Sequence, residues 1–108
     1  MGMTIVQKIL SRATGLQSVN VGDVVEPAVD CAMSHENGAL VVNQFNEVYK
    51  DTGIEPRVWD PKKIVIIFDH RVPAESSKTA NNQMKLRDFV AKQGIPNLHD
   101  IRGDQGGI

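Results

Sequence analysis

Two short polar segments contain the residues most capable of chemistry. Asp69 and His70 directly follow an apolar run. A carboxylate beside an imidazole can fix its tautomer and favour the imidazolium, which makes histidine a competent general acid near neutral pH. Neighbouring residues on a strand point to opposite faces, so the two side chains pair only if the chain turns there, which Pro73 favours. The alternative is a solvated turn at the end of a strand.

His35 lies in the second segment, before an expected helix. From there it could donate a hydrogen bond to a bound carboxylate, because anions are favoured near helix N-termini. Equally, Ser34 or Asn37 could simply cap the helix and leave His35 as a surface residue. The residues alone leave both interpretations open.

A third candidate is the glycine-rich end of the chain, residues 103–107, whose backbone N–H groups could cradle an anion. It matches neither the phosphate-loop motif nor the dinucleotide-binding motif, and a frayed terminus is the alternative interpretation.

Composition excludes several classes of function. Cys31 is the only cysteine and there are three histidines, so we expect no metal site in this chain, since one thiol cannot hold an iron–sulfur cluster or a structural zinc ion. A net charge of -1 offers no general attraction for nucleic acid or an anionic membrane. No apolar window is long enough for a membrane span or a signal peptide, so we expect a cytoplasmic protein.

The elements that must position the histidines alternate in type. A chain of 108 residues fits one domain at most, with one modest core. Residues 64–68 are five consecutive large apolar residues, typical of a strand buried in a parallel sheet. The expected order is helix 4–13, extended segment 24–33, helix 39–50, strand 64–68, a helix capped by Ser76 or Ser77 and ending at Gln93, and strand 97–101. This order predicts an α/β fold with parallel pairing, in which ligands bind outside the carboxyl ends of the strands.

Taken together, these segments resemble the start of the aconitase-type hydro-lyases, and the resemblance covers nearly all of the chain. The most similar branch is the large subunit of 3-isopropylmalate dehydratase with its homoaconitase-like relatives. The residues that carry it are Val29-Asp30, Ser34 to Asn37, Arg57 to Ile66, Asp69 to Ser76 and Gly106 to Ile108. The form of residues 69–74 is similar to the archaeal-type branch.

The resemblance implies a fold and three site residues. The fold is a partial three-layer α/β domain with parallel strands, and residues 1–108 form one incomplete N-terminal segment of an aconitase-type large subunit. His70 protonates the departing hydroxyl of a hydroxy-acid substrate, with Asp69 as its catalytic partner. His35 is a substrate-binding residue that donates a hydrogen bond to a substrate carboxylate.

The resemblance also implies a cofactor and a partner. In the family, three cysteines hold a 4Fe-4S cluster, one iron of which acts as a Lewis acid, and a separate small subunit or a C-terminal domain supplies a serine base. With Cys31 alone, this chain cannot build that cluster. We therefore expect the parent protein to be a hydro-lyase acting on a malate-like hydroxy acid, and the 108 residues to be inactive alone.

Two other interpretations stay open. The chain could be a truncated, non-catalytic module that binds a partner subunit, or a small free-standing α/β protein that binds an anion at its glycine-rich end. A partial domain leaves apolar faces uncovered, so we also expect an exposed apolar patch or self-association into a homo-oligomer.

Overall fold

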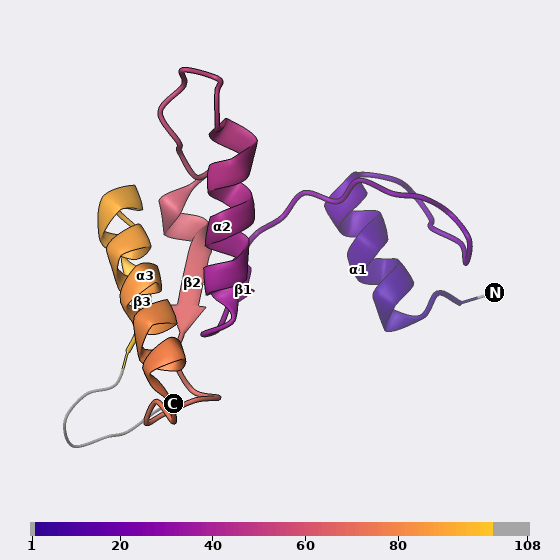
Figure 1. Cartoon of the computed structure of the whole chain (residues 1–108). Helices are drawn as coiled ribbons and strands as arrows, with labels where there is room; N and C mark the ends of the chain where they lie inside the picture. The colour runs from indigo at the N-terminus through magenta and orange to yellow at the C-terminus, as the bar shows by residue number, and fades with distance from the viewer. Residues whose placement is uncertain (1, 101–108) are drawn as a thin grey trace. The chain divides into compact units, whose positions relative to one another are not determined.

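The structure, a computed structural model, describes residues 2–100, and its internal contacts divide the chain into two compact units (Figure 1). One unit ends at Asp30 and the other begins at Cys31. That residues 1–108 form one incomplete α/β segment stays a prediction. None of the helices in the described part combines the length and the apolarity that a membrane crossing requires.

The first unit contains the helix α1, Ile5–Thr14, close to the predicted range. Thr4 and Gln7 form a reciprocal capping box at its start, in which each side chain accepts a hydrogen bond from the other residue's backbone N–H. Gly15 ends the helix in the left-handed conformation, with φ of 74°, which glycine adopts without steric cost.

The second unit is built on a sheet of three parallel strands in the order β1, β2, β3. Their ranges are Ala32–Ser34, Ile64–Ile67 and Asn97–His99. The predicted parallel α/β fold is confirmed. The strand predicted from residue 97 is described only to His99, and residues 101–108, with the glycine-rich segment, lie outside the described residues.

The extended segment predicted over residues 24–33 is largely wrong as a strand. Strand β1 begins only at Ala32 and continues through Ser34, one residue beyond the predicted segment. Before it, the Ala28 N–H donates to the carbonyl oxygen of Ala13 at the end of α1, so at this position the backbone bonds to the first unit instead of the sheet.

Helix α2, Gly38–Tyr49, connects β1 to β2, and helix α3, Ser77–Gln93, connects β2 to β3. Figure 1 shows both helices on the same side of the sheet. The core lies between them and the strands and consists of Ala39, Val42, Ile66, Phe68, Leu86, Val90 and Ile95. One helical layer of the predicted three-layer arrangement is therefore present in the second unit.

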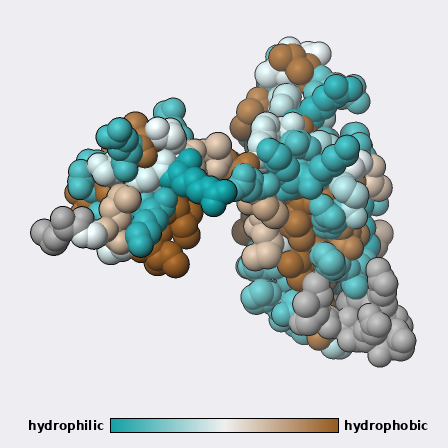
Figure 2. Space-filling view, turned by 180° about the vertical axis from the view of Figure 1, so that it is seen from behind, coloured by the Kyte–Doolittle hydropathy of each residue, from teal (hydrophilic) through white to brown (hydrophobic). Residues whose placement is uncertain are grey.

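Side chains alternate between the two faces of β2. Ile66 is buried and lies in the core with Phe68, whereas Val65 and Ile67 are half-buried on the face turned away from the helices. In the neighbouring strand Met33 pairs with Val65 and is 72% exposed. Figure 2 shows this side of the molecule, where apolar atoms reach the surface. The exposed apolar surface expected of a partial domain is thus present, and self-association stays a prediction.

Helix α3 carries the apolar residues Leu86, Phe89 and Val90 toward the core. Ser76 is its N-cap, because its hydroxyl oxygen accepts a hydrogen bond from the Thr79 N–H at 3.2 Å. One turn before Leu86 the buried residue is the polar Gln83.

Candidate active site

The two histidine segments leave the sheet at the same edge. His35 directly follows β1, and His70 lies three residues beyond β2. Because the strands are parallel neighbours, with Ser34 in register with Ile66, their carboxyl ends bring the two following loops together. The position of the site at the carboxyl edge agrees with the sequence analysis.

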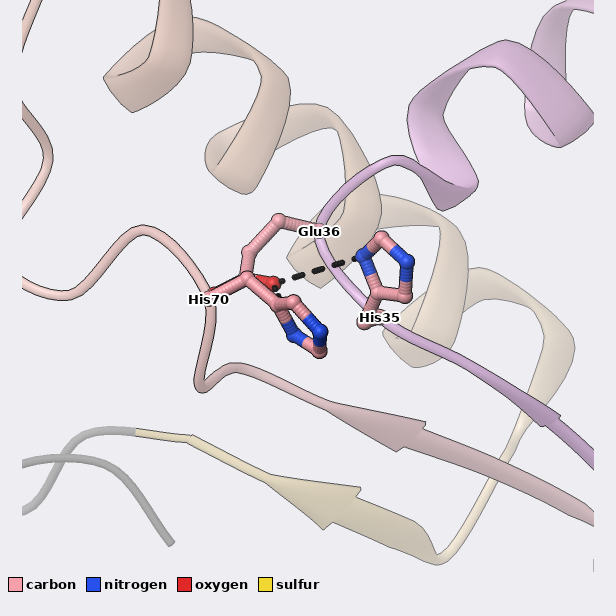
Figure 3. Close-up of side chains that lie close together, drawn as sticks. All are labelled: His35, Glu36 and His70. Atoms are coloured by element: carbon pink, nitrogen blue, oxygen red, sulfur yellow. Dashed lines mark ion pairs between the residues drawn. The ribbon is translucent and has the colours of Figure 1, made fainter.

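The structure places the His35 and His70 rings against each other (Figure 3). Their centroids are 4.2 Å apart and their planes differ by 22°, which is a stacked arrangement. The His35 side chain is 41% exposed and that of His70 is 64% exposed, so solvent or a ligand can reach both rings.

Glu36 lies beside the two rings, with a side chain that is only 2% exposed. Its Oε2 atom is 3.6 Å from Nδ1 of His35 and 3.8 Å from Nδ1 of His70. This oxygen is buried and accepts no hydrogen bond from the described residues. The other oxygen, Oε1, accepts a hydrogen bond of 2.9 Å from the backbone N–H of Arg71. Glu36 therefore touches both histidine-bearing loops.

The surroundings of Glu36 favour its charged form. Burial by itself would raise the pKa of the Glu36 carboxyl, because it removes water from the carboxylate. The backbone N–H groups of Arg71, of Glu36 itself and of Asp69, together with the charge of His70, outweigh burial and lower the pKa below its ordinary value. We infer that a buried negative charge lies beside the imidazoles at neutral pH.

Asp69 also lies at this edge of the sheet. It lines a cavity of about 270 Å³ together with Met33, Ser34, His35, Ile67 and His70. Within residues 2–100, His70 forms its ion pair with Glu36, and none joins it to Asp69. The backbone N–H of Asp69 helps to lower the pKa of the Glu36 carboxyl. The catalytic roles of Asp69 and His70 and the substrate-binding role of His35 stay predictions.

The loop that carries His70 is held by the start of α3. Gln83 Nε2 donates to the carbonyl oxygen of Arg71 at 2.9 Å, which satisfies this buried amide. The Arg71 guanidinium forms an ion pair of 2.9 Å with Glu75, and Thr79 Oγ1 donates to the same carboxylate at 2.7 Å. These contacts hold the backbone and side chain of Arg71, the residue directly after His70, against α3.

Glu36 is the residue that sequence analysis missed. An acidic residue just before a helix is common on a protein surface, so its type and position carry no special signal. The available signal was its neighbour: a carboxylate adjacent to His35, at the carboxyl end of a strand, can reach the loop after the next parallel strand.

His35, Glu36 and His70 are also the group in the described residues that most resembles a metal site, with ligand atoms within 4.8 Å of one another. The stacking of the rings opposes that use. A metal ion binds in the plane of an imidazole, and nearly parallel rings direct their Nδ1 lone pairs side by side instead of toward one point. One ring would have to turn before both could bind the same ion.

The chain does not fit an iron–sulfur cluster. Cys31 is its only cysteine, it is exposed, and it precedes β1 at the opposite end of the strand from His35. A cluster of the 4Fe-4S type requires several thiolates. No chemical step can therefore be assigned to a cluster held by these 108 residues.

No protein-family model matches the chain, but curated relatives match nearly all of it. It is 48% identical over 103 residues to a protein of Methanothermobacter thermautotrophicus named probable 3-isopropylmalate dehydratase large subunit, a match covering 94% of this chain and 23% of the relative. Coverage is the same for 3-isopropylmalate dehydratase large subunit 1 of Methanopyrus kandleri, at 46% identity. The probable methanogen homoaconitase large subunit of M. thermautotrophicus is 39% identical over 89% of this chain and 22% of the relative.

The chain thus spans about 23% of the length of the first two relatives. The resemblance inferred from the motifs is confirmed over almost all of the chain.

Proposed function

Because the chain is homologous over 94% of its length to 3-isopropylmalate dehydratase large subunits, we propose that it is part of a hydro-lyase that dehydrates and rehydrates a malate-like hydroxy acid. A homoaconitase-type reaction is the close variant of the same proposal, since a protein of that name is also a relative. The cytoplasmic location expected from the sequence belongs to this proposal.

The observation that carries the proposal is the stacked pair of His35 and His70 beside the cavity at the carboxyl edge of the sheet. Two imidazoles that can carry positive charge suit a substrate with two carboxylates. In the proposed reaction His70 donates a proton to the departing hydroxyl and His35 donates a hydrogen bond to a substrate carboxylate. Asp69, which lines the same cavity, is the proposed catalytic partner of His70.

The proposal includes a cofactor and a partner that this chain does not supply. A 4Fe-4S cluster would provide the Lewis acid for the hydroxyl, and a dehydratase small subunit would provide further substrate contacts. Since Cys31 cannot hold such a cluster alone, both belong to the whole enzyme, and we propose that the 108 residues are inactive by themselves.

Inactivity is tested by incubating the chain with an unsaturated diacid, iron and sulfide, and measuring hydration. We expect no turnover above that of the His70→Asn variant. Turnover by the unchanged chain that this substitution abolishes would contradict the proposal of inactivity alone.

Substrate binding is tested separately by titrating the chain with a malate-type hydroxy diacid and following its NMR spectrum. We expect the signals of His35 and His70 to shift in the unchanged chain. In His70→Asn, the shift of the remaining His35 signal should be lost. His99→Asn is the matched control, because His99 is the third histidine and lies on β3. Shifts that avoid both site histidines would contradict the proposed site.

An apolar groove favours the alternative, a non-catalytic module that binds a partner subunit. The groove has a volume of about 490 Å³ and lies between β1, α2 and the loop before β2. Met33, Val41 and Trp59 line it and are exposed. Sedimentation of the chain tests the homo-oligomer that could cover such a surface. A monomer that binds no malate-type diacid, yet forms a complex with a dehydratase small subunit, would favour the module over the enzyme.

A further inference from the structure

We propose that Glu36 is the positioning residue of this site: its buried carboxylate joins the two histidine-bearing loops and supplies the negative charge beside which the His35 and His70 rings stack. The inference deepens the proposed function, because it concerns how the same site is assembled. Its test uses no substrate, so its failure can be told apart from a failure of the hydro-lyase proposal.

The first part of the argument is mechanical. Glu36 belongs to the segment between β1 and α2, and Oε1 accepts from the Arg71 N–H in the segment between β2 and α3. The bond spans 35 positions of the sequence and directly joins the two segments. His35 and His70 are the immediate neighbours of its two ends, so this bond limits how far the rings can move apart.

The second part of the argument concerns Oε2 of Glu36, which is buried and accepts no hydrogen bond from the described residues. A buried carboxylate oxygen without a hydrogen bond is costly, unless a positive charge lies near. The Nδ1 atoms of His35 and His70 lie nearest, at 3.6 and 3.8 Å. Because Nδ1 of His35 accepts a hydrogen bond from the Asn37 N–H, the ring that can face this oxygen with a protonated Nδ1 is that of His70. The Arg71 guanidinium does not serve this role, because it pairs with Glu75.

The other charged groups around the site do not replace Glu36. Asp69 lines the cavity but forms no ion pair with either ring among residues 2–100. Glu75 accepts from Arg71 and Thr79 on the side of α3. In the part of the chain that the structure describes, the backbone N–H that donates to one of the rings is that of Asn37, which bonds to His35 Nδ1 at 3.3 Å. Of the acidic groups in the described residues, only Glu36 has a carboxylate oxygen within 4 Å of a nitrogen of each imidazole.

The test compares two substitutions. Glu36→Gln keeps a side-chain oxygen for the Arg71 N–H but removes the charge, whereas Glu36→Ala removes both. We expect amide exchange at Arg71 to be unchanged in Glu36→Gln and about tenfold faster in Glu36→Ala, the effect of losing one hydrogen bond. The nuclear Overhauser contact between the His35 and His70 rings should weaken in Glu36→Gln. Glu47→Gln, a charge change on the exposed face of α2, is the control.

A second measurement reports the charge directly, and a purely structural role of Glu36 would not affect it. The carboxyl signal of Glu36 is followed against pH in His70→Asn and in His99→Asn. Since the charge of His70 helps to lower the pKa of Glu36, we expect this pKa to rise in His70→Asn and to stay as it is in His99→Asn. The same Glu36 pKa in both variants, or an unchanged ring contact in Glu36→Gln, would overturn the proposal.

Discussion

The Oε1 atom of Glu36 accepts a hydrogen bond of 2.9 Å from the backbone N–H of Arg71, a residue 35 positions later in the chain. The two ends of this bond belong to loops that follow neighbouring parallel strands. The sheet brings the two loops to one edge, and this bond then joins them directly. Four predictions test the site and the core that supports it.

The charge of Glu36 should make folding stability depend on pH in the acidic range. Its pKa is lowered in the folded chain from the ordinary value of 4.5, so the unfolded chain takes up the proton first as pH falls. The stabilisation is complete above that ordinary value and is lost as pH falls through the lower pKa of the folded state. Urea unfolding measured from about pH 7 down to about pH 3 should show a smaller loss of stability in Glu36→Gln than in the unchanged chain.

Glu47→Gln is the control for that experiment, because Glu47 is exposed and pairs only with Lys50 in the described residues. Its pH dependence should match that of the unchanged chain. Parallel curves for the unchanged chain and Glu36→Gln would show that Glu36 does not contribute through its charge.

The cap of α3 gives a second prediction. Ser76→Ala removes the hydroxyl that accepts from the Thr79 N–H, and we expect it to lower the free energy of unfolding by about 1 kcal/mol. Ser77→Ala should have almost no effect, because Ser77 is the first helical residue and exposed. Chemical denaturation of the two variants side by side is the measurement. An equal loss in both would mean that Ser76 is not the cap.

Much of this arrangement follows from local sequence rules. The apolar run at residues 64–68 and the alternation of helix and strand signals are enough to predict parallel strands. Once the strands are parallel, His35 and His70 must share an edge. The end of α3 at Gln93, after which Gly94 adopts the left-handed conformation with φ of 67°, is also a local feature. These features depend on neighbours in the sequence, which is why they could be predicted.

The role of Glu36 could not be predicted in the same way. An isolated acidic residue is rarely buried, and what makes its burial tolerable here is a backbone N–H 35 positions away. The pairing of Asp69 with His70 was inferred from adjacency, but the ion pair of His70 in the described residues is with Glu36. Strand β1 was placed too early because apolar content alone does not report which backbone groups find a partner in the sheet.

Leu86 gives a third prediction, about the core beneath the site. It is 1% exposed, and Leu86→Ala should cost about 2–5 kcal/mol through lost burial and the cavity left behind. The matched control is Leu40→Ala, the same change at a residue of α2 that is 69% exposed, with an expected effect of about 0.5 kcal/mol or less. The measurement is the urea concentration at the unfolding midpoint of each variant, compared with that of the unchanged chain. Similar losses would contradict the core described above.

The fourth prediction concerns the tie between α3 and the residue after β3. Arg87 Nε and Nη2 donate to the two oxygens of Asp100 at 2.6 and 3.0 Å, a two-point contact that lysine cannot reproduce. Because both side chains are partly exposed, Arg87→Lys should cost only about 0.5–1 kcal/mol. The difference from the unchanged chain should shrink as salt is added. A loss that salt does not reduce would show that the charge pair is not its cause.

The uncovered face of the sheet has a consequence for the chemistry. Met33 and Ile67, which help to form that apolar face, also form part of the wall of the histidine cavity. Any protein surface that packs over the strands would at the same time roof this cavity and expel its water. Electrostatic interactions strengthen when water leaves, so the interaction between the Glu36 carboxylate and the imidazoles would become stronger on assembly. Assembly and the electrostatics of the histidine cavity would in this way be coupled through two shared side chains.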